Sequence, residues 1–88
     1  MSSKHILENA RIFLLTDLFA NTEAANKEML ISISTLNAAV NMTRMIKSHI
    51  EENLEDVPDW TIECTQTTIA VTRPSGEQRR VIVQSIAR

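Results

Sequence analysis

The sequence contains few of the residues that interrupt a chain or cross-link it. Its 88 residues include one glycine, two prolines and one cysteine. A single cysteine excludes an intrachain disulfide, and one cysteine with two histidines is too few for a metal-binding cluster. Domains of this size bury only about 60–65% of their unfolded surface and often gain stability from a cross-link or from oligomerisation. Because no cross-link is available, we expect the chain to oligomerise.

Aromatic residues and net charge are also scarce. The only aromatic residues are Phe13, Phe19 and Trp60, so the core must be aliphatic. The net charge is −2, which argues against a protein that mainly binds nucleic acid. Charged residues interrupt the apolar N-terminal stretch, so no signal peptide is predicted, and the longest uncharged run is too short to span a bilayer. We therefore expect a cytoplasmic, non-enzymatic protein with no cofactor, no metal and no membrane contact.

The first 57 residues contain neither proline nor glycine, which favours a helical region. A first helix is predicted from Ser2 or Ser3 to about Ala20, with apolar residues on two sides. A second, long helix is predicted from about Glu23 to Leu54 or Asp56. The junction at residues 21–23 favours an antiparallel helical hairpin, and a continuous bent helix is the alternative.

Fifteen consecutive residues, Met29 to Thr43, carry no charge. Within a helix, these residues and those that follow would form two apolar seams. The stronger seam consists of Met29, Ile33, Leu36, Val40, Thr43, Ile46, Ile50, Leu54 and Val57. The softer seam consists of Ile31, Ala38, Met42, Met45 and His49. A helix without charge is shielded on more than one side, which predicts self-association or a protein partner.

From Trp60 onward, threonine and β-branched residues predict strands. The segment from Arg73 to Glu77 suits a type I turn closed by a glycine bulge. This register pairs Ile69 with Val81. It places Ile69, Val71, Val81 and Val83 on one face, with Thr68, Ala70, Arg80 and Ile82 on the other. A bulge or bend near Gln66-Thr67 would reconcile the apolar alternation within a single first strand.

Together these patterns predict one α+β domain over residues 1–88. A helical hairpin over residues 1–57 would precede a β-hairpin over residues 58–88, and the helices would pack between subunits as a bundle. The partner-binding residues we expect are Ile31, Ala38, Met42 and Met45 for apolar contact, with Asn37, Asn41 and Arg44 as polar anchors. Core packing of the methionines and a solvated asparagine face are the competing interpretations.

Other chemistry-bearing residues have weaker patterns. Asp17 could be a buried polar group that fixes register, or it could lie at the edge of the apolar stripe. His49 could bind metal or sense pH, but a surface or interface histidine is the simpler interpretation. Cys64 alternates with apolar residues and is predicted to face inward. An arginine-bearing hairpin could enter a DNA groove or pair with the acidic segment 51–56; its arginines are Arg73, Arg79, Arg80 and Arg88.

This pattern of a short, acidic chain with a helical hairpin before a small sheet resembles the small accessory proteins of phages and prophages. Among these are antirepressors and other inhibitors. The resemblance implies a regulator that occupies or disassembles another protein, such as a transcriptional repressor. The function we expect is thus a non-enzymatic regulatory protein that oligomerises and binds a protein partner to modulate it. The alternative is a small dimeric DNA-binding protein that uses Arg73, Arg79 and Arg80.

Overall fold

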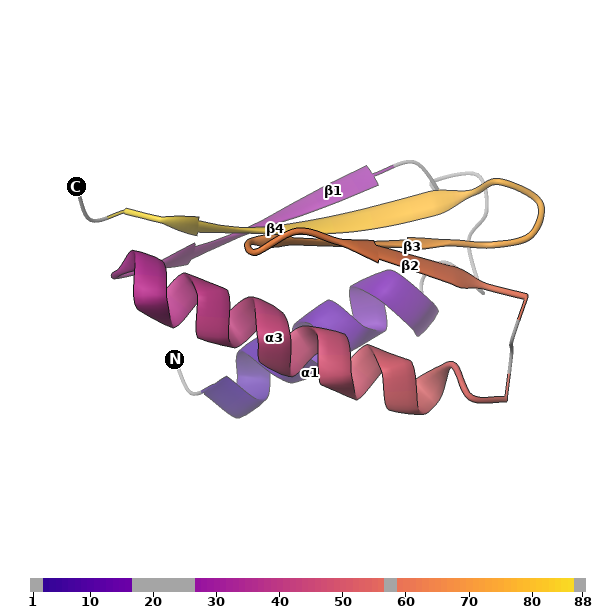
Figure 1. The fold of residues 1–88 in the computed structure, drawn as a ribbon, viewed down its shortest axis with the longest axis horizontal. Coiled ribbons are helices and arrows are strands. Elements are labelled where there is room, and N and C mark those ends of the chain that lie inside the picture. Colours follow the sequence, from indigo (N-terminus) through magenta and orange to yellow (C-terminus); the bar gives the residue numbers. More distant parts are fainter. Residues whose placement is uncertain (1–2, 17–26, 57–58, 87–88) are drawn as a thin grey trace.

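In the computed structural model, helices cover one face of a four-stranded sheet (Figure 1). The structure describes residues 3–16, 27–56 and 59–86. The elements in chain order are the helix α1 (Ser3–Arg11), its π-helical continuation η1 (Ile12–Thr16), β1 (Lys27–Ile33), α3 (Leu36–Asn53), β2 (Thr61–Cys64), β3 (Thr68–Thr72) and β4 (Gln78–Ser85). The expected helix end at Ala20, the junction at residues 21–23 and Asp17 lie outside these ranges.

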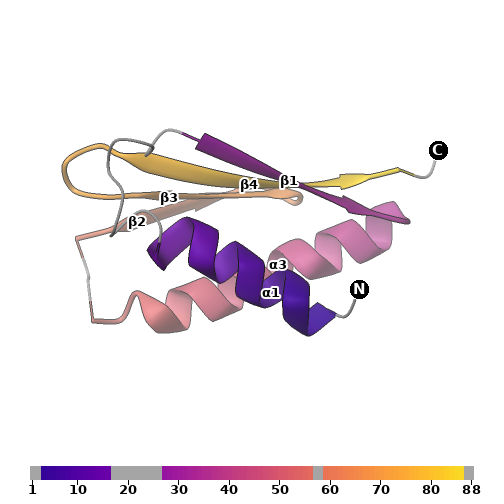
Figure 2. The ribbon, with the colours of Figure 1, turned by 180° about the vertical axis from the view of Figure 1, so that it is seen from behind.

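The strand order in the sheet is β1-β4-β3-β2. β2, β3 and β4 form an antiparallel meander, whereas β1 lies parallel to β4, from Lys27 opposite Arg79 to Ile33 opposite Ser85. Seen from behind, α1 and α3 lie beside one another beneath the same face (Figure 2). Neither described helix is both long and apolar enough to cross a membrane.

The prediction of one long helix from Glu23 was wrong, because Lys27–Ile33 forms the strand β1. In this strand Met29, Ile31 and Ile33 are half-buried, while Leu30 and Ser32 are exposed. Such an alternation has the period of two that a half-buried strand shows, and β-branched isoleucine suits it. The predicted α+β architecture is therefore corrected. The chain is not a helical hairpin followed by a β-hairpin, since one strand precedes α3, and the helices pack on the sheet of their own chain.

The helix α3 begins where β1 ends, and Thr35 supplies its N-cap. Thr35 has extended backbone angles, and its side-chain oxygen accepts a hydrogen bond from the backbone N–H of Ala38 at 3.1 Å. This bond satisfies one of the free donors of the first helical turn. The second half of the predicted strong seam does face the core, since Thr43, Ile46, Ile50 and Leu54 are buried.

The predicted C-terminal hairpin and its register are confirmed. Ile69 lies opposite Val81, and the Arg73 N–H donates to the Glu77 carbonyl at 2.9 Å. Gly76 has a φ of +103°, a conformation that favours glycine, so the turn chemistry was readable from the sequence. The expected single strand from Trp60 was wrong. The chain reverses after Cys64, where the Thr65 N–H donates to the Thr68 carbonyl, and this reversal separates β2 from β3.

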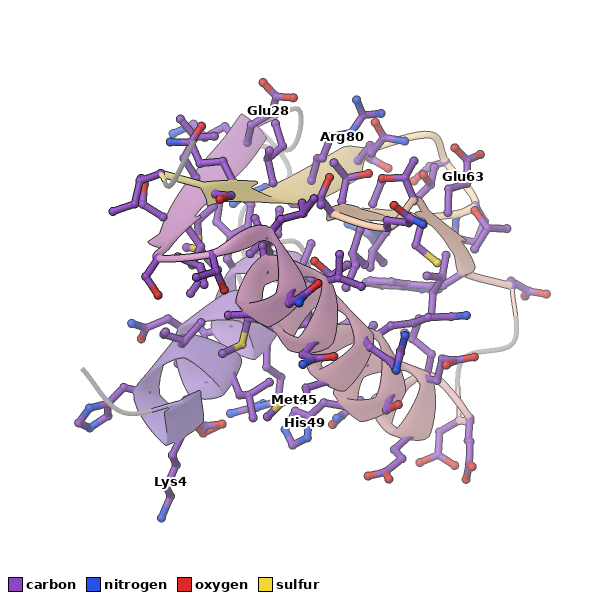
Figure 3. The ribbon with its side chains drawn as sticks, turned by 60° about the vertical axis from the view of Figure 1, so that its left-hand side comes forward. Lys4, Glu28, Met45, His49, Glu63 and Arg80 are labelled. Atoms are coloured by element: carbon purple, nitrogen blue, oxygen red, sulfur yellow. The ribbon has the colours of Figure 1, made fainter. Side chains whose placement is uncertain are left out.

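The core lies between the helices and the inner face of the sheet. Its fully buried large side chains are Leu14, Ile46, Ile50, Ile69, Val71, Val81 and Val83. Burial of such side chains contributes about 1.5–3 kcal/mol each, so this layer carries most of the stability of the fold. Figure 3 shows that Glu28, Arg80 and Glu63 lie on the opposite, open face of the sheet. Apart from Leu30, Ala70 and Ile82, this outer face is polar, which is typical of a sheet with one solvated side.

Candidate protein-binding edge

The strand β1 is one edge of the sheet, and among the described residues no strand pairs with its outer side. The Ile86 N–H donates to the Ile33 carbonyl at 2.9 Å, so Ile33 directs its backbone groups toward the β4 side. Backbone groups of successive strand residues point to alternate sides. Those of Leu30 and Ser32 therefore point away from β4, and they offer donors and acceptors to a further strand.

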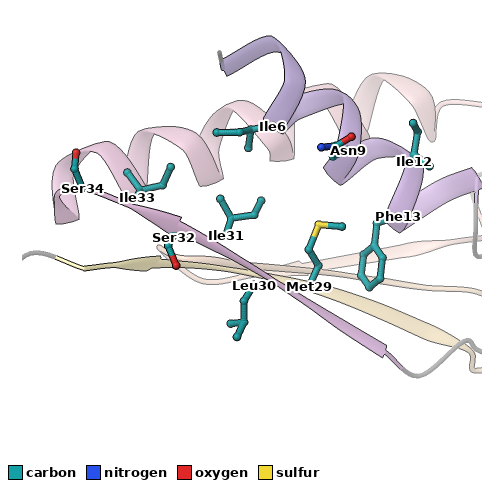
Figure 4. A pocket seen from close by; sticks show the side chains of 10 residues that line it. All are labelled: Ile6, Asn9, Ile12, Phe13, Met29, Leu30, Ile31, Ser32, Ile33 and Ser34. Atoms are coloured by element: carbon teal, nitrogen blue, oxygen red, sulfur yellow. The ribbon is translucent and has the colours of Figure 1, made fainter. Parts of the chain in front are cut away.

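An apolar groove of about 720 Å³ lies between this edge strand and the first helix (Figure 4). Its lining consists of Ile6, Asn9, Ile12 and Phe13 from the helical segment and of residues 29–34 from β1 and the turn after it. Met29, Ile31 and Ile33 point toward the helix, whereas Leu30 points to the opposite face of the sheet. None of the lining residues is charged, so the groove suits apolar side chains.

Large apolar side chains are exposed around this edge. Leu30 is 62% exposed on the opposite face of the edge strand, and Ile12, which lines the groove, is 39% exposed. Leu36 begins the helix that follows β1, and Ile86, which is 66% exposed, bonds to the last residue of β1. Among the described residues, the one further large hydrophobic side chain with such exposure is Met45, on α3. Apolar exposure gathered at one place marks an interaction surface more than scattered exposure does.

A cation–π contact anchors Phe13, which lines the groove. The guanidinium carbon of Arg79 lies 4.8 Å from the centre of the Phe13 ring, and Arg79 is 2% exposed. Because this site is desolvated, the attraction is stronger than at a surface. The contact fixes η1 against β4 and so holds the helical wall of the groove in place.

The outer surface of α1 carries one ion pair. Arg11 Nε donates to Glu8 Oε1 at 2.8 Å, one helical turn away. This hydrogen bond from Arg11 lowers the pKa of the Glu8 carboxyl, and the same bond raises the pKa of Arg11. Both groups are largely solvated, so the pair contributes little to stability.

The residues expected to bind a partner do not form one surface. Ile31 lies in the groove, on β1 and not on a helix. The other six lie on α3, where Asn37, Asn41 and Arg44 are exposed and Met45 is 42% exposed. Ala38 is half-buried, and Met42 is 6% exposed inside the core of the chain itself. Sequence reasoning missed Leu30, Ile12 and Phe13, although the alternation from Met29 to Ile33 was a signal for the first of them.

The arginines expected to contact nucleic acid are also dispersed. Arg79 is buried against Phe13, whereas Arg80 lies on the open face of the sheet. Arg73 lies over the Trp60 ring at 5.7 Å from its centre. Cys64 was predicted to face inward, and its place opposite Ile69 does put it on the inner side of the sheet, but it is exposed at the end of the edge strand β2. His49 is half-buried on α3.

No family model matches the chain, and no curated protein or solved structure shows significant similarity to it. A strand edge that is uncharged from Met29 to Ile33 and lies beside an apolar groove provides main-chain hydrogen bonds and pockets for alternate side chains, which are the requirements for binding an extended polypeptide.

Proposed function

We propose that this chain is a non-enzymatic interaction protein that binds another polypeptide as an additional strand along the outer edge of β1. The observation that carries the proposal is an exposed edge strand without a charged residue from Met29 to Ile33, backed by an apolar groove. Natural edge strands usually carry lysine, proline, a bulge or extreme shortness to prevent such pairing. In β1 the charged residues Lys27 and Glu28 lie at the start of the strand, and the unprotected stretch from Met29 to Ile33 fits a segment that is covered when the protein acts.

The geometry specifies the chemistry of the partner. A strand beside β1 would bond to the backbone of Leu30 and Ser32, and each net hydrogen bond would contribute about 0.5–1.5 kcal/mol. Its alternate side chains would point into the groove beside Met29, Ile31 and Phe13. A charged side chain there would lose its hydration without a compensating partner, so the segment that fits is extended and apolar at alternate positions.

The alternative of DNA binding has no comparable support. Its three candidate arginines face different directions, and the most buried of them, Arg79, is held under Phe13. The regulatory role expected from the sequence stays a prediction, because the edge of β1 supports a mode of binding and carries no information on the process that the binding would serve.

Amide hydrogen exchange measured by NMR tests the proposal. The full chain is studied at rising concentration, and at low concentration with a synthetic peptide of alternating valine and threonine that carries lysines only at its ends. We expect one of these additions to slow exchange at Leu30 and Ser32 while the amides of β2 are unchanged. If neither addition protects the two amides, the proposal is wrong.

A further inference from the structure

We infer that the polypeptide that pairs with β1 is β1 of a second copy of this chain, in an antiparallel register centred on Leu30. This inference rests on the proposed function, and it names the partner of the same edge. It follows from the length of the strand, from the position of its charges and from the side chains that the monomer leaves exposed.

The strand Lys27–Ile33 has seven residues, and Leu30 is its middle residue. An antiparallel pair centred there uses the whole strand in both copies. It places Leu30 opposite Leu30 of the second copy, and Glu28 opposite Ser32. The backbone groups that point to the outer edge belong to alternate residues of β1, namely Glu28, Leu30 and Ser32. In this register each of these residues lies opposite another of them and can form backbone hydrogen bonds with it.

The charges of β1 are compatible with self-pairing. In this register Lys27 lies opposite Ile33 of the second copy, and Glu28 lies opposite Ser32, so no like charges face one another. The Ser32 hydroxyl accepts a hydrogen bond from Gln84 Nε2 at 3.1 Å. Its own hydrogen remains able to bond to the Glu28 carboxylate of the second copy. Glu28 thereby gains a hydrogen-bonding partner, and Lys27, at the end of the strand, meets no like charge.

The same register covers the exposed apolar side chains. Residues opposite one another in a sheet project from the same face, so the two Leu30 side chains, each 62% exposed in the monomer, meet on the open face. On the inner face Met29 lies opposite Ile31 of the second copy, which extends the apolar layer across the joint. The helices of both copies then cover the same face of an eight-stranded sheet. Ile12 of each copy borders the space enclosed between them.

The other edge does not support self-pairing of this kind. In β2, which has four residues, the Thr65 N–H bonds to the Thr68 carbonyl of β3, so the backbone groups that point to the free edge are those of Ile62 and Cys64. An antiparallel pair that joins Ile62 to Cys64 of the second copy places Glu63 opposite Glu63, and these like charges repel. Of the two edge strands, β1 is therefore the one whose length, charges and exposed side chains are compatible with pairing to a second copy.

Matched lysine substitutions on the two edges test the inference. Leu30→Lys sets two like charges against one another at the twofold axis, whereas Thr61→Lys changes an exposed, outward-facing residue of β2. By light scattering, the unmodified protein and Thr61→Lys should have twice the chain mass of 9.9 kDa. Leu30→Lys should weaken the dimer about a hundredfold or more, because two leucines lose their burial and the charges repel. Circular dichroism should show all three folded.

A second measurement keeps the test independent of the folding of the variant. In a mixture of isotope-labelled and unlabelled copies of the unmodified protein, an intermolecular NOE should connect the Hα atoms of Met29 and Ile31, because these residues face each other as a closely spaced pair. A dimer that lacks this NOE, or a dimer that Leu30→Lys leaves intact, would overturn the inference.

The outcomes separate this inference from the proposed function. A chain that stays monomeric at every concentration, but whose Leu30 and Ser32 amides are protected by the valine–threonine peptide, would overturn self-pairing and leave strand addition standing. A monomer whose β1 amides neither the peptide nor higher concentration protects would overturn both.

Discussion

The two edge strands of the sheet differ in length, in charge and in what surrounds them. β1 has seven residues, no charge from Met29 to Ile33 and an apolar groove behind it. β2 has four residues, of which three are exposed, and one of these is Glu63. Shortness and charge are common protections of an edge strand. This chain therefore protects one edge of its sheet from pairing and leaves the other able to pair.

The two edge strands are expected to rest on one shared core, so the substitution Ile46→Ala should destabilise both of them. Ile46 is 1% exposed on α3, so its truncation should lower the free energy of unfolding by about 2–5 kcal/mol. In urea denaturation, probes at both edges should report the same lowered midpoint. Lys47→Ala, at an exposed position next to it, should stay within about 0.5 kcal/mol of the unmodified protein. Separate transitions at the two edges would contradict a shared core.

Near each edge of the sheet an arginine forms a cation–π contact with an aromatic ring. The two contacts should differ in strength. Phe13→Leu removes the ring under the buried Arg79 and should cost about 1–2 kcal/mol of stability. Trp60→Leu removes the ring under Arg73, where the longer distance of 5.7 Å and greater solvent exposure should limit the lost cation–π attraction to about 0.5–1 kcal/mol. The attraction at each site is isolated by a double-mutant cycle, in which the arginine (Arg79 or Arg73) is also replaced by methionine, alone and together with the ring substitution. Urea denaturation gives the free energy of unfolding of each variant. Equal couplings would mean that burial does not distinguish the two sites.

Each edge strand is also followed by a threonine whose side-chain oxygen accepts backbone hydrogen bonds. Thr35→Ala removes the N-cap after β1 and should cost about 1 kcal/mol, whereas Thr35→Ser should retain it. Thr65→Ala removes the oxygen that accepts from the N–H groups of Thr67 and Thr68 after β2. Because this turn is exposed, the loss should be about 0.5 kcal/mol. Thermal denaturation followed by circular dichroism measures the stability of each variant. A larger loss of stability in Thr65→Ala than in Thr35→Ala would contradict the expected order.

The smallest expected effect is the pH dependence of two carboxyls outside the edge strands, those of Glu8 and Glu77. The hydrogen bond from Arg11 lowers the pKa of Glu8, and the hydrogen bond from Ser75 lowers the pKa of Glu77. A lowered pKa in the folded state stabilises the fold above the ordinary carboxyl pKa, and this stability is lost as the pH falls through the lowered value. Glu8→Gln and Glu77→Gln should therefore flatten the acid limb of the stability curve. NMR titration of each carboxyl checks the direction, and a raised pKa would contradict it.

The parts of the fold that local chemistry determines could be read from the sequence. The turn around Pro74 and Gly76 fixed the register of β3 and β4, and the alternation of Ile69, Val71, Val81 and Val83 assigned the buried face. The apolar spacing of Ile46, Ile50 and Leu54 likewise identified the inner face of α3.

The part that failed depends on pairing between distant residues. Met29, Ile33 and Leu36 fit a helical spacing, while Met29, Ile31 and Ile33 fit a strand, and a short apolar run does not decide between the two. The decision comes from β4, which lies about fifty residues later and supplies a parallel neighbour. The groove was missed for the same reason, because it exists only once β1 is a strand and the first helical segment lies beside it.

The parallel pairing of β1 with β4 also has a consequence for synthesis. Ser32 and Gln84, which bond across the pair, are 52 residues apart. A ribosome therefore releases β1 well before it makes β4, the strand that will flank it. Until that moment the hydrogen-bonding groups on both sides of β1 are open, and the long loop must close before the sheet gains its last member. The segment suited to recognition in the finished protein is thus also the segment that depends most on rapid completion of the chain.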